Sequence, residues 1–165
     1  GGYGRTPLHH ASCIILKEGN HHETVKVLLE NGADPNAVND AGDNDLHEDL
    51  MHEEIDPGII KLLIEHGIDL EMEGSYGSTA LSRAAEKGNL ELINFFNEKL
   101  GASTDKIKIF EKALLEAMRN DQKDTVIHLL REGKEGFKKD MYRVNVLSYA
   151  ARQGYTDIVE LLFDD

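Results

Sequence analysis

The sequence holds a single cysteine, Cys13, so no disulfide can form within the chain. It also lacks an Asn-x-Ser/Thr glycosylation site and a charged-then-apolar leader segment. Its longest apolar run is about six residues, far short of the roughly 20 that a membrane-spanning helix needs. These absences favour an intracellular protein, cytoplasmic or nuclear, with no segment inserted in a membrane.

Positive charge is also scarce, with 18 Lys and Arg against 31 Asp and Glu and a net charge of −13. A phosphate backbone would be repelled, so nucleic acid is disfavoured as a partner. The imbalance lies in the first half: residues 1–74 hold 16 acidic and 4 basic side chains, whereas residues 75–165 hold 15 and 14. Residues 40–56 carry eight carboxylates and no Lys or Arg. We therefore expect a strongly acidic surface there.

An internal repeat runs through the whole chain. Pairs of apolar residues three apart, on one helical face, recur at separations of 35, 33, 33 and 33 residues. The pairs are Val25/Leu28, Ile60/Leu63, Ile93/Phe96, Val126/Leu129 and Val159/Leu162. A second apolar column consists of Leu8, Leu46, Leu81, Leu114 and Leu147. The spacing predicts five units, each of two short helices and a turn. A helical repeat of about 34 residues with fixed Trp and Pro fits poorly, because the chain has no Trp and only 3 Pro.

Local signals place the helix ends. Thr79 is an N-cap candidate for one helix, Gly88 and Asn89 end that helix, and residues 90–100 form the next. Asp56 followed by Pro57 starts a second helix in the second unit. Three glycines are positioned to end the second helices of their units: Gly32, Gly67 and Gly133.

Specific sequence matches accompany this period. Residues 4–11 read Gly-Arg-Thr-Pro-Leu-His-His-Ala, and residues 23–37 read Glu-Thr-Val-Lys-Val-Leu-Leu-Glu-Asn-Gly-Ala-Asp-Pro-Asn-Ala, which closely resembles the ankyrin repeat. Residues 77–89 and 147–162 match well too. The second unit departs from the pattern, with Asn44 and Asp45 where the family has Thr-Pro, and the fourth unit keeps only its apolar skeleton.

The resemblance implies an all-α ankyrin-repeat solenoid of stacked antiparallel helix pairs with projecting turns. We expect one array over residues 1–165, with units at about 1–36, 37–71, 72–104, 105–137 and a truncated 138–165. Because the chain opens with two glycines and no Met, and stops inside a helix, we expect an excised segment without terminal capping units. The resemblance also implies structural hydrogen bonds for His9 and His47.

No constellation for catalysis or metal binding has the required spacing. His47 and His52 are five apart, rather than the three or four that align two ligands on a helix, and an EF-hand-like count fails because its sixth position is Glu48 instead of glycine. Cys13 has no Asn or Asp to orient a base and fits a small buried or half-buried thiol. We expect no enzyme, no cofactor and no metal site. A metal- or pH-responsive face, rich in histidine and acid, stays open as an alternative for the first two units.

The resemblance implies that a partner docks on the turn tips and the inner first helices. The position before the turn glycine gives Tyr3, Ala41 and Tyr76. The equivalent positions in the last two units, where Phe110 and Arg143 replace the glycine, give Ile109 and Tyr142, so tyrosine occupies three of five equivalent tips. Tyrosine is enriched at binding hot spots, although each ring could instead cover the neighbouring turn. The predicted partner-binding residues are Tyr3, Arg5, Asp40, Asp43, Met51, His52, Ser75, Tyr76, Ser78, Glu86, Lys87, Arg119, Asn120, Met141, Tyr142 and Arg152.

The sequence thus predicts a protein-protein interaction module without catalysis of its own. The acidic second unit beside Tyr76 favours a partner with a basic contact surface. We expect a monomeric segment. The alternative is the targeting arm of a larger enzyme or of a bacterial effector acting in a host cytosol, with the catalytic domain outside this segment.

Overall fold

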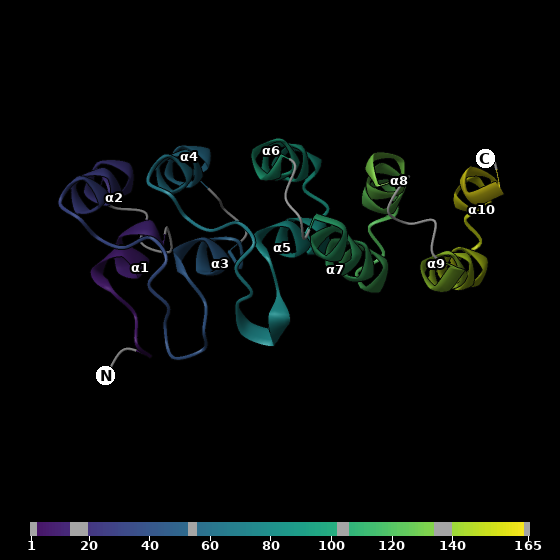
Figure 1. Cartoon of the computed structure of the whole chain (residues 1–165), viewed down its shortest axis with the longest axis horizontal. Coiled ribbons are helices and arrows are strands. Elements are labelled where there is room, and N and C mark those ends of the chain that lie inside the picture. Colours follow the sequence, from purple (N-terminus) through teal and green to yellow (C-terminus); the bar gives the residue numbers. More distant parts are fainter. Residues whose placement is uncertain (1–2, 14–19, 53–55, 102–105, 134–139, 164–165) are drawn as a thin grey trace. The chain divides into compact units, whose positions relative to one another are not determined.

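The computed structural model describes residues 3–13, 20–52, 56–101, 106–133 and 140–163 (Figure 1). The regular elements within these ranges are helices, and no strand occurs among them. The helices are α1 (Pro7–Ser12), α2 (His21–Glu30), α3 (Asp45–Asp49), α4 (Pro57–Glu65), the 3-10 turn η1 (Ser75–Gly77), α5 (Ala80–Glu86), α6 (Leu90–Leu100), α7 (Lys106–Arg119), α8 (Lys123–Glu132), α9 (Asp140–Gln153) and α10 (Thr156–Phe163).

The chain divides into two compact units, Gly1–Arg83 and Ala84–Asp165. In the first unit α1 packs against α2 and α3, and α2 packs against α4 (Figure 1). In the second unit α7 packs against α8, and α9 packs against α10. The paired, all-helical architecture predicted from the sequence is confirmed.

Polar side chains fix the helix starts of the first unit. Thr6 caps α1 in a capping box with His9. The Thr6 Oγ1 accepts from the His9 amide at 3.4 Å, and the Thr6 amide donates to His9 Nδ1 at 3.2 Å. Asn44 Oδ1 accepts from the His47 amide at 3.1 Å and starts α3. Asp56 caps α4, with proline at the first helical position, as predicted.

The helix ends predicted around the third unit are confirmed. Thr79 Oγ1 accepts from the Ser82 amide at 3.3 Å in the first turn of α5. Asn89 Oδ1 accepts from the Leu92 amide at 3.0 Å, so α6 begins at the residue after the predicted break. Gly133 ends α8, and its amide donates to the Leu129 carbonyl at 2.9 Å.

The apolar column forms the core of both units with one exception. Leu8, Leu46 and Leu81 are buried in the first unit, and Leu114 is buried in the second. Leu147, in contrast, is only half-buried. In α9 the buried residues are Val146, Tyr149 and Ala150, spaced three and four apart on one face. Leu147 lies one residue beyond Val146, about 100° around the helix.

Candidate protein-interaction surface

Three turns project from the first unit on the side of α1 and α3: the first tip (residues 3–5), the second tip (39–43) and the third tip (74–78) (Figure 1). The Asp40 amide donates to the Tyr3 carbonyl at 2.9 Å, which joins the first tip to the second. The Ser75 amide donates to Asp43 Oδ1 at 2.7 Å, which joins the second tip to the third. The three tips therefore form one hydrogen-bonded row, the tip row.

Two tyrosines stand out from this row. The Tyr3 side chain is 81% exposed and Tyr76 is fully exposed. Both have left-handed backbone conformations, with φ of 47° and 58°, and each precedes a glycine with φ of 67°. Such a conformation costs a residue with a Cβ roughly 1–2 kcal/mol, so the surrounding bonds must hold it. The rings are thus displayed on constrained turns.

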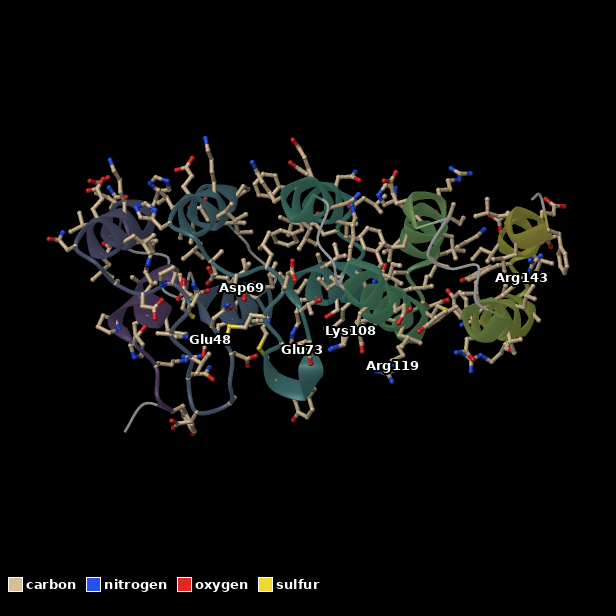
Figure 2. The ribbon with its side chains drawn as sticks, in the orientation of Figure 1. Glu48, Asp69, Glu73, Lys108, Arg119 and Arg143 are labelled. Atoms are coloured by element: carbon tan, nitrogen blue, oxygen red, sulfur yellow. The ribbon has the colours of Figure 1, made fainter. Side chains whose placement is uncertain are left out.

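A buried carboxylate holds the first two tips. Glu48 Oε1 accepts from Arg5 Nε at 2.9 Å and from Asn39 Nδ2 at 2.5 Å, so it contacts both tips from α3 (Figure 2). Asn39 Oδ1 in turn accepts from the amides of Ala41 and Asp43, at 2.8 and 3.1 Å. Arg5 is therefore bound within the unit rather than presented as an isolated cation.

Arg83 holds the third tip from α5. Its Nε donates to Ser78 Oγ at 3.1 Å and its Nη2 donates to Ser75 Oγ at 3.0 Å. The Ser78 hydroxyl also donates to the Ser75 carbonyl at 2.8 Å. Both serines, predicted as partner contacts, are half-buried and bonded within their own tip.

The histidines at equivalent positions in the first two units are structural. His9 Nδ1 contacts Thr6, and its Nε2 lies 3.2 Å from the Asp43 carbonyl. His47 Nε2 lies 3.1 Å from the carbonyls of both Met72 and Ser78. Burial lowers the pKa of His47, against the opposing effect of nearby Asp43. The implied bonding role of both rings is confirmed.

The acidic run does not form the solvent-exposed field that we expected. Asp40 is exposed, but four other carboxylates of the run are buried: Asp43, Asp45, Glu48 and Asp49. Helical spacing explains Asp49, because it lies three residues after Leu46 on the face that packs inward. Asp43, predicted as a partner contact, is buried and accepts a backbone hydrogen bond inside the tip row.

The end of α3 carries one exposed and one paired predicted residue. Met51 is exposed, whereas His52 is half-buried with its Nε2 3.2 Å from Cys13 Sγ. Across the part of the chain that the structure describes, no group of three or more His, Cys, Asp or Glu side chains is placed to hold a metal ion.

Predicted tips in the second unit lie inside helices. Ile109 is buried in α7 and Tyr142 lies within α9, because these helices begin at residues 106 and 140, before the expected turns. The prediction of turn tips at these two positions is wrong. A hydrogen bond with Glu111, followed by burial, raises the pKa of the Tyr142 hydroxyl.

The other predicted residues of the second unit are dispersed along its helices. Arg119 projects from the end of α7 and pairs with Glu116 at 2.7 Å (Figure 2). Asn120 and Arg152 are exposed, and Lys87, just after α5, is half-buried. Glu86, the last residue of α5, is also half-buried. The Met141 side chain lies outside the described residues.

Comparison with known proteins agrees with the helix pairs. The family described as "Ankyrin repeats (3 copies)" matches residues 14–108. The chain belongs to the ankyrin-repeat family. The human (Homo sapiens) protein transient receptor potential cation channel subfamily A member 1 is 28% identical over 172 residues, which cover 99% of this chain and 15% of the human protein. This ankyrin-repeat chain thus spans about 15% of the length of that relative.

Ankyrin repeats are generally protein-protein interaction modules, and the fold is typically non-catalytic. The helices of the described residues are too short or too polar to cross a membrane. In this member of the family the first unit retains projecting turns, whereas α7 and α9 replace the turns expected in the second.

Two residues that organise the tips were missed from the sequence. Asn39 joins the second tip to Glu48, and Arg83 holds both serines of the third tip. A signal existed for Asn39, because an Asn side chain at a turn favours a hydrogen bond from the backbone amide two residues on, here that of Ala41. Arg83 gave no comparable signal, since its role depends on the fold of the turn that precedes α5.

Proposed function

We propose that this chain binds a partner protein through the tip row of its first unit and performs no chemistry itself. The observation that carries the proposal is the exposure of Tyr3 and Tyr76 on turns fixed by hydrogen bonds. A tyrosine offers a large amphipathic surface and loses little conformational freedom on binding. Turns that are already ordered lower the entropic cost of association further.

Charge indicates the chemistry of the partner. Residues 1–83 contain 16 acidic and 5 basic side chains, a net charge of −11. Asp40 is exposed in the second tip, and Glu71 is exposed just before the third. Glu73 is also exposed just before the third tip (Figure 2). Carboxylates beside exposed aromatics favour a partner surface rich in Lys or Arg that also presents an apolar side chain. The charges would speed association, and the tyrosines would prolong the complex.

The proposed contact set is narrower than the sequence prediction. It consists of Tyr3, Asp40 and Tyr76, with Met51 as an apolar extension at the end of α3. Arg5, His52, Ser75 and Ser78 support the surface from within the first unit. A role in binding for the second-unit residues remains a proposal; these are Glu86, Lys87, Arg119, Asn120, Met141, Tyr142 and Arg152.

Selection of binding peptides from a random displayed library tests this function. We expect the chain to enrich peptides that combine Lys or Arg with an apolar residue. Tyr76→Ala should then speed dissociation of an enriched peptide, because it removes the exposed ring. Asp40→Lys should slow association and flatten its dependence on salt between about 50 and 500 mM, where the screening length falls from roughly 14 to 4 Å.

Val27→Ala is a matched control, since Val27 is an exposed apolar residue on α2 away from the tips. It should leave both rates unchanged. Enriched peptides that bind the Tyr3→Ala/Tyr76→Ala variant as tightly as the wild type would contradict the proposed surface. Association that is indifferent to salt would contradict the proposed basic partner.

The human relative supports a second candidate, in which this chain is the interaction arm of a larger protein. That relative is a cation channel by name, and the match occupies 15% of its length. The full reading frame that encodes this chain tests the candidate. Membrane-spanning segments in the frame would support a channel-like context, and a catalytic domain would support the enzyme or effector alternative. A frame with no further domain would contradict both.

A further inference from the structure

The contact between α1 and α3 has an unusually polar interior. Three carboxylates on one short helix, Asp45, Glu48 and Asp49, are 1%, 5% and 6% exposed. Arg5 is the cation bound to them, and it donates to Glu48 alone. From α1, the Ser12 hydroxyl donates to Asp45 Oδ1 at 2.9 Å. Three buried acids thus share one arginine, one hydroxyl and the Asn39 side-chain amide.

Two carboxylate oxygens in this interior lack a partner. Among the described residues, Asp45 Oδ2 and Glu48 Oε2 are buried and accept no hydrogen bond. Burying an ionised carboxylate is costly unless it is fully paired, and buried groups shift toward their neutral form instead. Neighbouring carboxylates also oppose each other's ionisation. The geometry therefore favours a proton on this cluster.

Burial shifts the pKa values of two of these acids in the direction that the geometry favours. Burial raises the pKa of Asp45 to about 6, and nearby Glu48 adds to the rise, while Ser12 and His9 oppose it. Burial also raises the pKa of Asp49 well above its usual range, and the Asp45 charge raises it further. Both acids therefore take up protons at milder pH than they would in an unfolded chain.

Other charged or titratable groups face the cluster from each neighbouring element. Arg5 precedes α1, His9 lies within it, and Cys13 ends it beside His52 from the end of α3. Asp56, the cap of α4, also raises the pKa of Asp49. On α3 itself, burial lowers the pKa of His47. Its contribution to stability therefore falls as the pH falls, which is opposite to the contribution of the two acids.

We propose that the α1–α3 contact is a proton-linked clamp, in which the buried Asp45 and Asp49 carboxyl groups take up protons as the pH falls and the contact closes more firmly. Glu48 lies within the same cluster and bonds to the first tip through Arg5 and to the second through Asn39. Closure of the clamp therefore orders the tips as well as the helices. The proposal concerns the chain alone and does not depend on any partner.

The sign of the pH effect on stability follows from the difference in bound protons between the folded and unfolded chain. With a pKa raised in the folded state, Asp45 binds more protons folded than unfolded, so its contribution to stability grows as pH falls. That contribution is complete below the unfolded value of about 3.9 and is lost as pH rises through about 6. Asp45 alone then shifts the opening equilibrium roughly tenfold between pH 7.5 and 5, and Asp49 acts in the same direction.

Hydrogen exchange on the whole chain tests the clamp. The readouts are the amides of α1 and α3 and the Asp40 amide, which donates to the Tyr3 carbonyl, each corrected for the intrinsic pH dependence of exchange. We expect protection in the wild type to rise about tenfold or more from pH 7.5 to pH 5, relative to an Asp45→Asn/Asp49→Asn variant. The variant should be more protected than the wild type at pH 7.5. His47 is present in both chains, so its effect cancels.

Asp34→Asn is the matched control, because Asp34 is exposed in the first unit and its Oδ1, which accepts from the Asn36 amide, is kept by asparagine. It should follow the wild-type pH profile. A double variant with the wild-type profile, or less protected at pH 7.5, would overturn the clamp. If that variant does not fold, carbon NMR of the Asp45 carboxyl in the wild type decides: a midpoint near 6 supports the clamp, and one below about 4.5 overturns it.

Discussion

The two units differ in the length of their inner helices, which are α1 and α3 in the first unit and α7 and α9 in the second. In the first unit α1 and α3 have 6 and 5 residues, and the chain before them forms the tips. In the second unit α7 and α9 have 14 residues each, beginning where turns would otherwise project. A short inner helix leaves chain free to form projecting turns, whereas a long one adds buried apolar area.

Their interiors differ in the same way. The α7 and α8 helices meet through small and aliphatic side chains such as Ala113, Leu114, Val126 and Leu129. The first unit instead buries charge beneath its tips, with Glu48 bonded to two of them. Apolar burial stabilises without directional demand, while buried polar groups fix particular geometries at some cost in stability. The first unit is therefore specialised for presenting turns.

Truncation of a core side chain should have the largest effect. Leu81→Ala in the first unit should cost about 2–5 kcal/mol and Phe96→Ala in the second about 3–5 kcal/mol, because each leaves a cavity in a fully buried site. Urea unfolding measures both. Leu115→Ala, at a partly exposed position of α7, should cost less than about 1 kcal/mol. A Leu81 variant as stable as the Leu115 variant would contradict the core assignment.

Removal of the Asn39 side chain should have the second-largest effect on stability. Asn39→Ala should cost about 1–3 kcal/mol, since it removes a donor to buried Glu48 and the acceptor for two tip amides. Thermal or urea unfolding measures the loss. Asn36→Ala is the control, because Asn36 makes its two bonds at an exposed site and should cost about 1 kcal/mol or less. Equal losses would mean that the polar interior does not support the tips.

Substitution of Asp121, which accepts hydrogen bonds from two tyrosines in the second unit, should cost less stability. Asp121 Oδ1 accepts from the Tyr149 and Tyr155 hydroxyls at 2.9 and 3.0 Å, and its φ is 55°. Asp121→Ala should cost about 1 kcal/mol, because it removes the acceptor and leaves a Cβ residue in a left-handed turn. Asp121→Asn keeps the oxygen and tolerates that conformation, so its loss should be smaller. Urea unfolding of the two variants checks the order, and equal losses would mean that only the charge of Asp121 matters.

The smallest stability effect should come from Tyr76→Asn, and its sign should be favourable. Asparagine adopts a φ of 58° more readily than tyrosine, so the change should stabilise by up to about 1 kcal/mol. The same change should weaken binding of an enriched peptide, because the exposed ring is lost. Stability from urea unfolding and affinity from the peptide should thus move in opposite directions. A loss of both would mean that Tyr76 covers its neighbouring turn.

The helices were predictable because their signals are local. Capping by Thr79 and Asn89 and the Asp56-Pro57 start each depend on a few adjacent residues, and the apolar columns repeat five times. The tips of the second unit were mispredicted because Ile109 and Tyr142 were placed by equivalence to other units, while their own segments favour helix. Local sequence outweighed the repeat there.

Burial of the acids was harder to foresee. Asp49 occupies the position that the buried Ala11 and Ala84 hold in α1 and α5, whereas its charge alone suggests a solvated face. Only the positions of Leu46 and Leu50 on the same helical face indicate that it points inward. The burial of Asp43 could not be predicted from its neighbours in sequence. It depends on a hydrogen bond from the amide of Ser75, which lies 32 residues later in the third tip.

The tyrosines also give the chain an intrinsic fluorescence that can report on its surface. It has five tyrosines and no tryptophan, so its intrinsic ultraviolet emission comes from tyrosine alone. Tyr3 and Tyr76 are in solvent in the first unit, whereas Tyr149 and Tyr155 donate to a carboxylate in the second. Solvent quenchers such as iodide or acrylamide would act most on the tip rings. Occupation of the tip row can therefore be followed in unlabelled protein, as loss of that quenching.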